Sequence, residues 1–513
     1  MIKYALLSVF DKTGIIELAG KLHELGYKII STGGTAKILI EDKIPVISIS
    51  EITGNPESFD GRMKTISFQI EGGILYDRTN PVHVKEAREL NIKPIDIVVC
   101  NLYPFEQKQT IENIDVGGPT MIRSAAKNFK NVLVIIDPND YQMVIDYLYR
   151  HPERSDIRKE LAAKAFNHLS FYDSQIASFL STDFFPNEIT IPGRKSKDLR
   201  YGENPHQKAS VYFSPNTNSP LLNLKKLWGR DLSLTNFTDI NAGLEAVKLF
   251  KEPSAVVIKH NSPCGIALGK NPSEALKRAI EGDSESAFGG VIVVNSKMDL
   301  KTAKEIVKFK DERKANIDIV AVPEIDKKAL ELLTLVRKSM GIYIFGKFRN
   351  SKFEIRNSHL MNVKWVDGGF IIQTADMDIE KSFKDWKVVT KNKPSAKQIS
   401  QMKVAWKFIS RIRSNAIIIV DKNLPMTRGI GSGQTSRVRS VKIALEQAGK
   451  WTKGGILASD SFFPFPDSVK LAAEHGITAI VQQGGSLNDK LSIEEADKAG
   501  IAMVFTNRRA FWH

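Results

Sequence analysis

Residues 4–35 read YALLSVFDKTGIIELAGKLHELGYKIISTGGT. Residues 4–10 and 27–31 are short apolar runs bounded by turn residues, which predicts a strand at each. Between them apolar side chains recur at helical spacing from Ile15 to Leu25, and Gly26 is placed to end that helix. A strand, a helix and a second strand in this order predict a β-α-β unit, whose two strands run parallel.

The same alternation continues through the first part of the chain. The apolar runs 46–49, 95–100 and 132–136 predict three more strands, and residues 117–127 predict a helix that two glycines and a proline open. We therefore expect an α/β fold with a parallel sheet covered by helices. Ligands bind such sheets at the carboxyl ends of the strands, so functional residues are expected in the loops that follow the strands.

The second part of the chain repeats this pattern. A long helix is predicted over residues 158–180, and prolines and a glycine after it place a domain boundary near 185–198. Beyond the boundary, strands are predicted at 255–258, 291–294, 318–322, 416–420, 477–481 and 501–506. Helices are predicted at 272–281, 327–338, 396–412, 437–449 and 467–475. This part is long enough for two α/β subdomains.

The composition limits the class of protein. The chain has 513 residues, which predicts two or three domains, and its 42% hydrophobic and 26% charged residues are ordinary for a globular protein. The sequence contains no run of 18 or more apolar residues, so no membrane span is expected. The N-terminal apolar run lacks the cleavage site of a signal peptide. The two cysteines, Cys100 and Cys264, form no CxxC pair, which favours a cytoplasmic protein without disulfides or a thiolate zinc site.

The net charge of +15, from 73 basic and 58 acidic residues, allows two functional interpretations. One is nucleic-acid binding, and the other is binding of small anionic substrates. The basic residues are scattered, and the chain has neither a dense basic tail nor an aromatic-basic motif of the RNP type. A lysine-rich surface without a special role is equally compatible with the composition alone.

Glycines and polar residues follow the predicted strands of the first part. SVFDKTG (8–14) and STGGT (31–35) are turns whose backbone N–H groups can approach a phosphate, although such turns also occur without a ligand. GRMKT (61–65) adds two cations, and NLYPF (101–105) follows another strand. Asp115 precedes a helix on which Arg123 and Lys127 share a face; a helix cap and a solvated face would explain these three residues equally well.

The second part holds further polar clusters, RYGENPHQ (200–207), KHNSPCG (259–265), GIGSGQTSR (429–437) and ASDSFFPF (458–465). The positive charge of Lys259 would help to keep the His260 imidazole neutral and basic for acid-base catalysis, although a histidine at a strand end is often structural. The glycine-rich turn is a candidate anion site, and the three Phe either stack a flat heterocycle or belong to the core. A zinc deaminase is excluded, because its signature needs a second cysteine where Ala267 stands.

In this order, the motifs resemble one family, the bifunctional AICAR transformylase/IMP cyclohydrolase. DVGGPTMIRSAAKN (115–128) and ESAFGG (285–290) complete the set, and the resemblance spans essentially the whole chain. It implies an IMP cyclohydrolase domain at 1–190, with a methylglyoxal-synthase-like parallel-sheet core at about 1–145. It also implies an AICAR transformylase domain at 191–513, built of two cytidine-deaminase-like α/β subdomains.

The resemblance also implies the reactions and the partners. The transformylase moves a formyl group from the cosubstrate 10-formyltetrahydrofolate to AICAR, giving FAICAR and tetrahydrofolate. The cyclohydrolase then closes FAICAR to IMP with loss of water, the last step of purine biosynthesis de novo. Family members are intertwined homodimers with transformylase sites across the subunit interface, and they need no metal, nucleic acid or membrane.

For the transformylase, the resemblance implies three catalytic residues. His260 takes the proton from the AICAR amine, which is a poor nucleophile because its lone pair is delocalised. Lys259 assists proton transfer at the departing folate nitrogen or stabilises the developing oxyanion, and Asn415 contacts the formyl-transfer centre. The matching substrate-binding residues are Arg200, Tyr201, Gly289, Glu324, Arg437, Asp460 and Phe462.

For the cyclohydrolase, the carboxamide nitrogen attacks the formyl carbon of the same molecule. The protein therefore has to hold the reactive conformer and stabilise the oxyanion, and Lys64 matches the oxyanion partner. Tyr103, Asp115 and Lys127 match the group that handles protons. The matching substrate-binding residues are Ser8, Lys12, Thr32, Gly33, Gly34, Thr35, Arg62, Asn101 and Gly117.

The chain departs from the family's pattern after the catalytic lysine. Lys64 and Thr65 are followed by Ile66-Ser67-Phe68, where the family usually has Leu-His-Pro. Further departures bear on the transformylase pocket and are Glu324, Pro466, Ala510 and Trp512. Two alternatives follow: a transformylase with a weakened cyclohydrolase domain and, more distantly, a basic nucleic-acid-binding protein.

Overall fold

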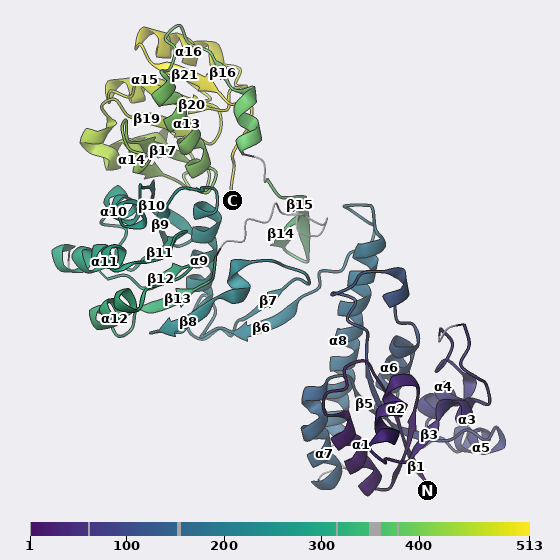
Figure 1. Cartoon of the computed structure of the whole chain (residues 1–513). Helices are drawn as coiled ribbons and strands as arrows, with labels where there is room; N and C mark the ends of the chain where they lie inside the picture. The colour runs from purple at the N-terminus through teal and green to yellow at the C-terminus, as the bar shows by residue number, and fades with distance from the viewer. Residues whose placement is uncertain (1, 60–61, 151–154, 314–315, 348–360, 377–378) are drawn as a thin grey trace. The chain divides into compact units, whose positions relative to one another are not determined.

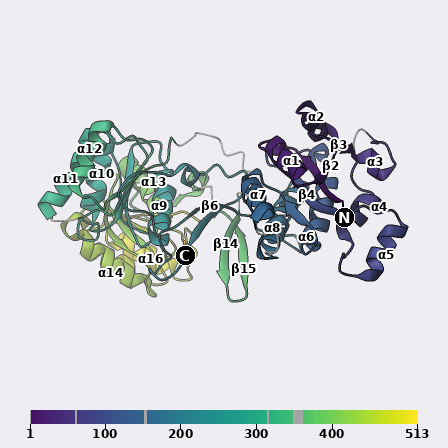
Figure 2. The same ribbon diagram turned by 90° about the horizontal axis from the view of Figure 1, so that it is seen from below.

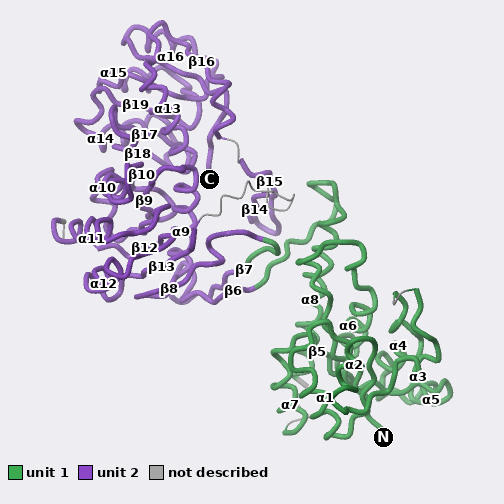
Figure 3. The backbone as a smooth tube through the Cα atoms, in the orientation of Figure 1, with its two compact units in different colours: residues 1–194, 213–216 green, residues 195–212, 217–513 purple. Residues whose placement is uncertain are grey.

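The computed structural model describes residues 2–59, 62–150, 155–313, 316–347, 361–376 and 379–513. These residues form two compact units, which Figure 3 colours separately. Unit 1 comprises residues 1–194 and 213–216, and unit 2 comprises residues 195–212 and 217–513. Each unit has its own sheets and its own hydrophobic core.

Unit 1 is built on a five-stranded sheet in the order β3-β2-β1-β4-β5 (Figure 1). All of its strand pairs are parallel, as the alternation of strands and helices predicts. The strands are β1 (Lys3–Val9), β2 (Tyr27–Ser31), β3 (Val46–Ser48), β4 (Ile95–Asn101) and β5 (Leu133–Ile135). The strand order reverses between β1 and β4, which is where sheets of this type bind ligands.

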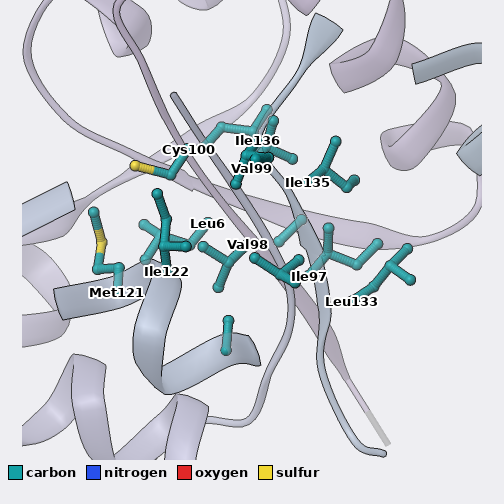
Figure 4. Packing of buried hydrophobic residues seen from close by; sticks show 14 of the residues in the cluster. Leu6, Ile97, Val98, Val99, Cys100, Met121, Ile122, Leu133, Ile135 and Ile136 are labelled. Atoms are coloured by element: carbon teal, nitrogen blue, oxygen red, sulfur yellow. The ribbon is translucent and has the colours of Figure 1, made fainter. Parts of the chain in front are cut away.

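The helices of unit 1 follow the strands, as in other doubly wound sheets. They are α1 (Ile15–Glu24), α2 (Gly33–Glu41), α3 (Ile49–Thr53), α4 (Phe68–Leu75), α5 (Pro81–Glu89), α6 (Gly117–Lys127), α7 (Tyr141–Arg150) and α8 (Ser155–Leu180). Figure 4 shows Ile122 of α6 beside Leu6 and Val98 of the central strands, and all three are fully buried. Each such side chain contributes about 1.5–3 kcal/mol by leaving water, so this core holds the strand ends in place.

Unit 2 contains two six-stranded sheets, in the orders β10-β9-β11-β12-β13-β8 and β18-β17-β19-β20-β21-β16. The strands of the first are β8 (Lys225–Trp228), β9 (Ser254–Lys259), β10 (Ser262–Leu268), β11 (Val291–Val294), β12 (Ile319–Val322) and β13 (Gly341–Ile344). Those of the second are β16 (Lys387–Val388), β17 (Ile417–Val420), β18 (Thr427–Gly431), β19 (Ile456–Ser459), β20 (Ala479–Gln482) and β21 (Ala502–Phe505).

The two sheets of unit 2 are built on one plan. In each, the second strand is antiparallel to both neighbours and is followed by three parallel strands. The helices of the first half are α9 (Leu234–Val247), α10 (Pro272–Gly282), α11 (Leu300–Arg313) and α12 (Lys327–Val336). Those of the second are α13 (Ala396–Ile409), α14 (Arg437–Ala448), α15 (Asp467–Glu474) and α16 (Asp489–Lys498). The prediction of two α/β subdomains is confirmed.

The helices that open the two halves begin with the same local structure. Ser233 caps α9 and Ser395 caps α13, and each forms a capping box with the residue three positions later. The halves meet where their edge strands approach, since Leu268 N donates to Pro425 O at 2.9 Å and Ala267 forms an isolated bridge with Met426. Unit 2 is therefore a pair of similar subdomains joined near β10 and β18.

Two small ribbons lie outside these sheets. β6 (Arg194–Asp198) pairs with β7 (Ser210–Phe213) in the segment where the two units join, and β14 (Met361–Val366) pairs with β15 (Gly369–Thr374). Figure 2 shows the β14–β15 hairpin as a separate ribbon of unit 2. Within the described ranges, no helix is both long enough and apolar enough to cross a membrane.

Candidate active sites

In unit 1, Asn101 at the end of β4 fastens the loop that follows β1. Its side-chain oxygen accepts hydrogen bonds from the backbone N–H groups of Phe10 at 2.6 Å and Asp11 at 2.9 Å, and its amide donates to Asp11 O at 3.1 Å. Lys12 folds back on this loop and donates to the carbonyl oxygens of Val9 and Phe10. Partial burial lowers the pKa of Lys12, and its ammonium lies beside the strand end rather than in bulk solvent.

The second loop brings the start of α2 to the same edge of the sheet. Thr35 ties this helix to β1, since its hydroxyl accepts from Val9 N at 3.1 Å and donates to Val9 O at 3.0 Å. Thr32 is the N-cap residue, and its side chain makes no capping hydrogen bond, while Gly33 and Gly34 form the exposed first turn. The free N–H groups of a helix start attract anions, which fits a phosphate.

Lys64 lies next to this helix start. A Cβ built on Gly33 would stand 3.8 Å from Lys64 Nζ, an ordinary contact distance, so the ammonium lies directly beside the helix start. Lys64 pairs with Glu57, and the neighbouring Thr65 hydroxyl would lie 2.6 Å from a Cβ on Gly117. The tertiary structure therefore brings Lys64 close to α2 and its neighbour Thr65 close to the start of α6.

Asp115 stands at the beginning of α6. One carboxylate oxygen accepts from Gly118 N at 2.8 Å, and its backbone N–H donates to Tyr172 OH at 2.8 Å. Burial raises the pKa of Asp115, and the hydrogen bond from Gly118 opposes this shift. A carboxyl with a raised pKa that caps a helix can serve both as the predicted cap and as a proton-handling group.

The other residues predicted for the cyclohydrolase site are spread over β1, α6 and the loops of unit 1. Ser8 is half-buried on β1, and Tyr103 is half-exposed after β4. Arg62 is exposed and pairs with Glu112 at 2.6 Å. Lys127 is at the far end of α6, about 15 Å along the helix from Gly117 at 1.5 Å per residue, so this chain does not bring it to Asp115.

The surroundings of Lys127 form an open hollow between α6 and α8 with a volume of about 520 Å³. The residues that line it are Arg123, Ala126, Lys127, Phe129, Lys159, Ala162, Ala163 and Phe166. The floor is apolar and the rim is cationic. Arg123 and Lys127 share this face, as their spacing predicts.

In unit 2, His260 occupies the tight turn between β9 and β10. His260 and Asn261 are the two turn residues and have φ of 57° and 60°, the left-handed conformation that two-residue hairpin turns require. The buried carboxylate of Asp239 on α9 accepts from Asn261 N at 2.6 Å. Burial raises the pKa of Asp239, while the backbone N–H groups of the turn lower it. Asp239 thus fixes the backbone of the turn, while the His260 imidazole is exposed.

Lys259, the last residue of β9, reaches the loop before β11. Its ammonium donates to the carbonyl oxygen of Phe288 at 2.8 Å. Gly289 follows with φ of 72°, and a Cβ built there would meet nothing within 4 Å. Lys259, His260 and Gly289 therefore surround one open edge of the first subdomain.

A second cluster lies in the other subdomain, around Asn415. Arg437 donates to the Asn415 side-chain oxygen at 2.7 Å and to Ser459 Oγ at 3.0 Å, and it pairs with Asp460. Asp460 is fully buried and also accepts from Ala416 N at 3.0 Å. The cationic head of Arg437 is thus directed into the protein, where it orients the Asn415 amide.

The remaining predicted transformylase residues are Phe462, Glu324, Arg200 and Tyr201. Phe462 is half-buried after β19, and Glu324 after β12 pairs with Lys347 at 3.5 Å. Arg200 stacks on Tyr201 at 4.6 Å and lines a hollow of about 380 Å³ with Tyr343. Among the described residues, no hydrogen bond or ion pair joins the His260 turn to the Asn415 cluster.

Two features of the sites were not predicted from the sequence. Glu57 and Asp239 contact the proposed catalytic segments, yet they lie in stretches that carry no recognised motif. Both cysteines are buried, and burial raises the pKa of the Cys264 thiol to about 12. Within the described residues, no group of three or more His, Cys, Asp or Glu side chains is placed to hold a metal ion.

Two known protein families match this chain. The MGS-like domain matches residues 14–130, and the AICARFT/IMPCHase bienzyme family matches residues 125–447. The chain belongs to the AICARFT/IMPCHase bienzyme family. Lys64 and Asp115 lie within the span of the MGS-like match, and the His260 turn lies within the span of the bienzyme match.

Relatives of this bienzyme family resemble the chain over its whole length. The bifunctional purine biosynthesis protein PurH of Thermoanaerobacter sp. (strain X514) is 43% identical over 526 residues, covering 100% of both chains. The protein of the same name from Persephonella marina is 42% identical and covers 99% of both chains. That of Bacillus cereus (strain 03BB102) is 43% identical and covers 100% of both.

Proposed function

We propose that this member of the AICARFT/IMPCHase family uses 10-formyltetrahydrofolate to formylate AICAR and then cyclises FAICAR to IMP. The observation that carries the proposal is that each unit holds its own group of acid-base residues at a loop edge. Lys64 lies beside the start of α2 and Asp115 caps α6 in unit 1, and Lys259 and His260 lie at the exposed turn of unit 2. Two reactions on two units fit a full-length relationship to bifunctional enzymes.

In the formyl transfer, His260 accepts the proton that the AICAR amine loses as it attacks the formyl carbon. The exposed imidazole suits this role because Asp239 fixes the turn, so the backbone that carries the base does not have to be ordered during the reaction. Lys259 provides the charge that stabilises the oxyanion or passes a proton to the folate nitrogen. Its bond to Phe288 O holds the ammonium in place.

In the ring closure, the enzyme stabilises negative charge on the formyl oxygen. Lys64 lies beside the start of α2, where the free N–H groups of Gly33 and Gly34 would receive the phosphate. Asp115 and Tyr103 take up the proton that the carboxamide nitrogen loses and supply a proton to the hydroxyl that departs as water. The raised pKa of Asp115 suits a group that both accepts and returns a proton.

The alternative of a weakened cyclohydrolase rests on the residues after Lys64. Ser67 accepts a hydrogen bond from Ile70 N at 3.2 Å and caps α4, and Phe68 begins that helix with 63% of its surface exposed. Ser67 and Phe68 therefore form the start of α4, and Lys64 still lies beside Gly33. We therefore favour an active cyclohydrolase.

The proposal extends to the setting of the enzyme. We infer a homodimer in the cytoplasm, because the sites of unit 2 are split between two subdomains and both free cysteines suit a reducing compartment. In the proposed dimer, Asn415 of one subunit approaches His260 of the partner. Sedimentation of the purified enzyme at several concentrations would test this assembly.

The test of the two-site assignment uses the variants His260→Ala and Lys64→Ala. His260→Ala should lower tetrahydrofolate formation by about 100-fold or more, the usual contribution of a general base, and should leave the conversion of supplied FAICAR to IMP unchanged. Lys64→Ala should do the reverse. AICAR, FAICAR, IMP and tetrahydrofolate are quantified together, and equal loss of both activities in either folded variant would refute the assignment.

A further inference from the structure

Phe10 is an aromatic residue that lies outside the hydrophobic core of unit 1. It lies in the loop between β1 and α1, and 50% of its surface is exposed. The neighbouring Val9 is buried in the core, whereas Phe10 does not belong to the core cluster. An exposed aromatic ring among the residues assigned to the site is free to contact a flat ligand.

The position of this ring is set by residues of the proposed cyclohydrolase site. Phe10 N donates to the Asn101 side chain at 2.6 Å, and Phe10 O accepts from Lys12 Nζ at 3.2 Å. Both backbone groups of the residue are therefore held by side chains that we assign to substrate binding. The ring is kept at this edge of the sheet without being covered by it.

Phe10 also contacts Tyr103, which follows β4. The two rings meet edge to face, with centroids 5.3 Å apart and an interplanar angle of 64°. Tyr103 is 47% exposed, so the pair forms an open aromatic corner rather than a buried cluster. An edge-to-face pair leaves one ring face free, and a flat heterocycle can lie against that face.

We propose that Phe10 is a substrate-binding residue that stacks against the imidazole ring of FAICAR and the purine ring of IMP. This inference rests on the proposed cyclohydrolase function and adds a residue to its site. The heterocycle is flat and aromatic before and after ring closure, so the stacking stabilises substrate, transition state and product alike. Uniform binding of this kind lowers KM and leaves kcat nearly unchanged.

The test compares Phe10→Ala, Phe10→Leu and Phe10→Trp in the full-length enzyme. Titration calorimetry measures the Kd of IMP, which has a base, and of ribose 5-phosphate, which has none. Phe10→Ala should weaken IMP binding about tenfold, a loss within the range of one base–aromatic stack. Phe10→Leu should resemble the alanine variant, Phe10→Trp should bind IMP as well as the wild type does, and ribose 5-phosphate binding should not change.

Kinetics of FAICAR cyclisation provide the second measurement. Phe10→Ala should raise KM by a similar factor with little change in kcat, while Phe185→Ala, which removes another exposed ring of unit 1, should change neither. Unchanged IMP affinity in Phe10→Ala would overturn the inference, and so would an equal loss of ribose 5-phosphate affinity, which would indicate a displaced loop. A wild-type enzyme that neither binds IMP nor cyclises FAICAR would instead overturn the proposed function.

Discussion

At the scale of single residues, the charges of the two sites are used in different ways. In unit 2, the Asp460 carboxylate is fully buried and is paired with Arg437, so neither is free to bind substrate as the pair stands. In unit 1, the charge of Asp115 is only partly buried and has no cationic partner among the described residues. We infer that Asp460 positions Arg437 and Asn415, whereas Asp115 is placed for chemistry.

Removing the carboxylate of Asp460 should therefore cost stability. Asp460→Ala leaves the Arg437 guanidinium buried without a counter-ion, and we expect the free energy of unfolding to fall by about 3–5 kcal/mol. All six tryptophans belong to unit 2, so urea unfolding followed by tryptophan fluorescence reports on this unit alone. The matched control is Asp198→Ala, which breaks an exposed pair with Lys195 and should cost less than about 1 kcal/mol. Equal effects of the two substitutions would contradict the assigned role.

Asp115→Asn should lower the cyclohydrolase activity and raise the free energy of unfolding of unit 1. The folded pKa of Asp115 is raised, so its contribution to stability is fully present below the unfolded value of 3.8 and is lost as pH rises through the folded pKa. Asn does not titrate and can still accept from Gly118 N, so the variant should gain stability relative to the wild type as pH rises through this window. Cyclisation should fall by about 100-fold or more.

Far-UV circular dichroism during urea unfolding, at pH values from 3 to 7, provides the measurement for Asp115→Asn. The tryptophan signal identifies the transition of unit 2, and the remaining transition belongs to unit 1. If the difference in free energy of unfolding between Asp115→Asn and the wild type did not change with pH, the charge of Asp115 would not destabilise the folded state.

At the scale of elements, the two halves of unit 2 depend on close contact between a bulged edge strand and a helix. Gly265 on β10 lies against the Ala279 carbonyl of α10, and Gly429 on β18 lies against the Ala444 carbonyl of α14. The ladders shift register at both places. The same contact thus occurs in both halves, and a side chain at either glycine would separate helix from strand.

The variants Gly265→Ala and Gly429→Ala test this contact. An added Cβ would overlap a backbone carbonyl oxygen in each, and since backbone cannot rotate away we expect a loss of about 1–3 kcal/mol or more. Gly369→Ala is the control, because a Cβ there meets nothing within 4 Å and φ is not positive. Tryptophan fluorescence in urea compares the three, and a glycine substitution on β10 or β18 as mild as the control would refute the packing argument.

At the scale of the whole molecule, the two proposed reactions occupy different units. Unit 1 carries Lys64 and Asp115 in the loops around its parallel sheet, and unit 2 carries His260 and Asn415 in loops of its two related halves. Cyclisation removes FAICAR and so draws the formyl transfer forward. This coupling needs only that FAICAR reaches a working cyclohydrolase.

Mixing two inactive proteins should therefore restore the pathway. The variants Lys64→Ala and His260→Ala should each fail to make IMP from AICAR, and an equimolar mixture should make it, because each supplies the site that the other lacks. The rate of IMP formation is measured against wild-type enzyme at equal site concentration. If the mixture accumulated FAICAR without IMP, exchange of the intermediate between molecules would be ruled out.

The amino-acid sequence by itself predicted the five strands of unit 1 and the composition of the sites. These strands, and helices such as the one from Ile15 to Leu25, follow from local spacing, because a helix or strand needs only the periodicity of its own residues. The edge strands β8, β10, β16 and β18 and the interior strands β13 and β19 were not predicted, since they are short or contain glycine and depend on a neighbouring strand. The helices α4, α5 and α7 were not predicted either. The motifs also predicted which loops carry functional groups.

Only the tertiary structure decided which of these groups meet. Lys64 stands beside Gly33, the Asp239 carboxylate supports the His260 turn, and Phe10 meets Tyr103, although each pair is distant in sequence. Lys127 shares a short motif with Asp115 but lies a helix length away. The physical reason is that spacing along the chain sets local conformation, whereas contacts between distant segments depend on how buried faces pack into a common core.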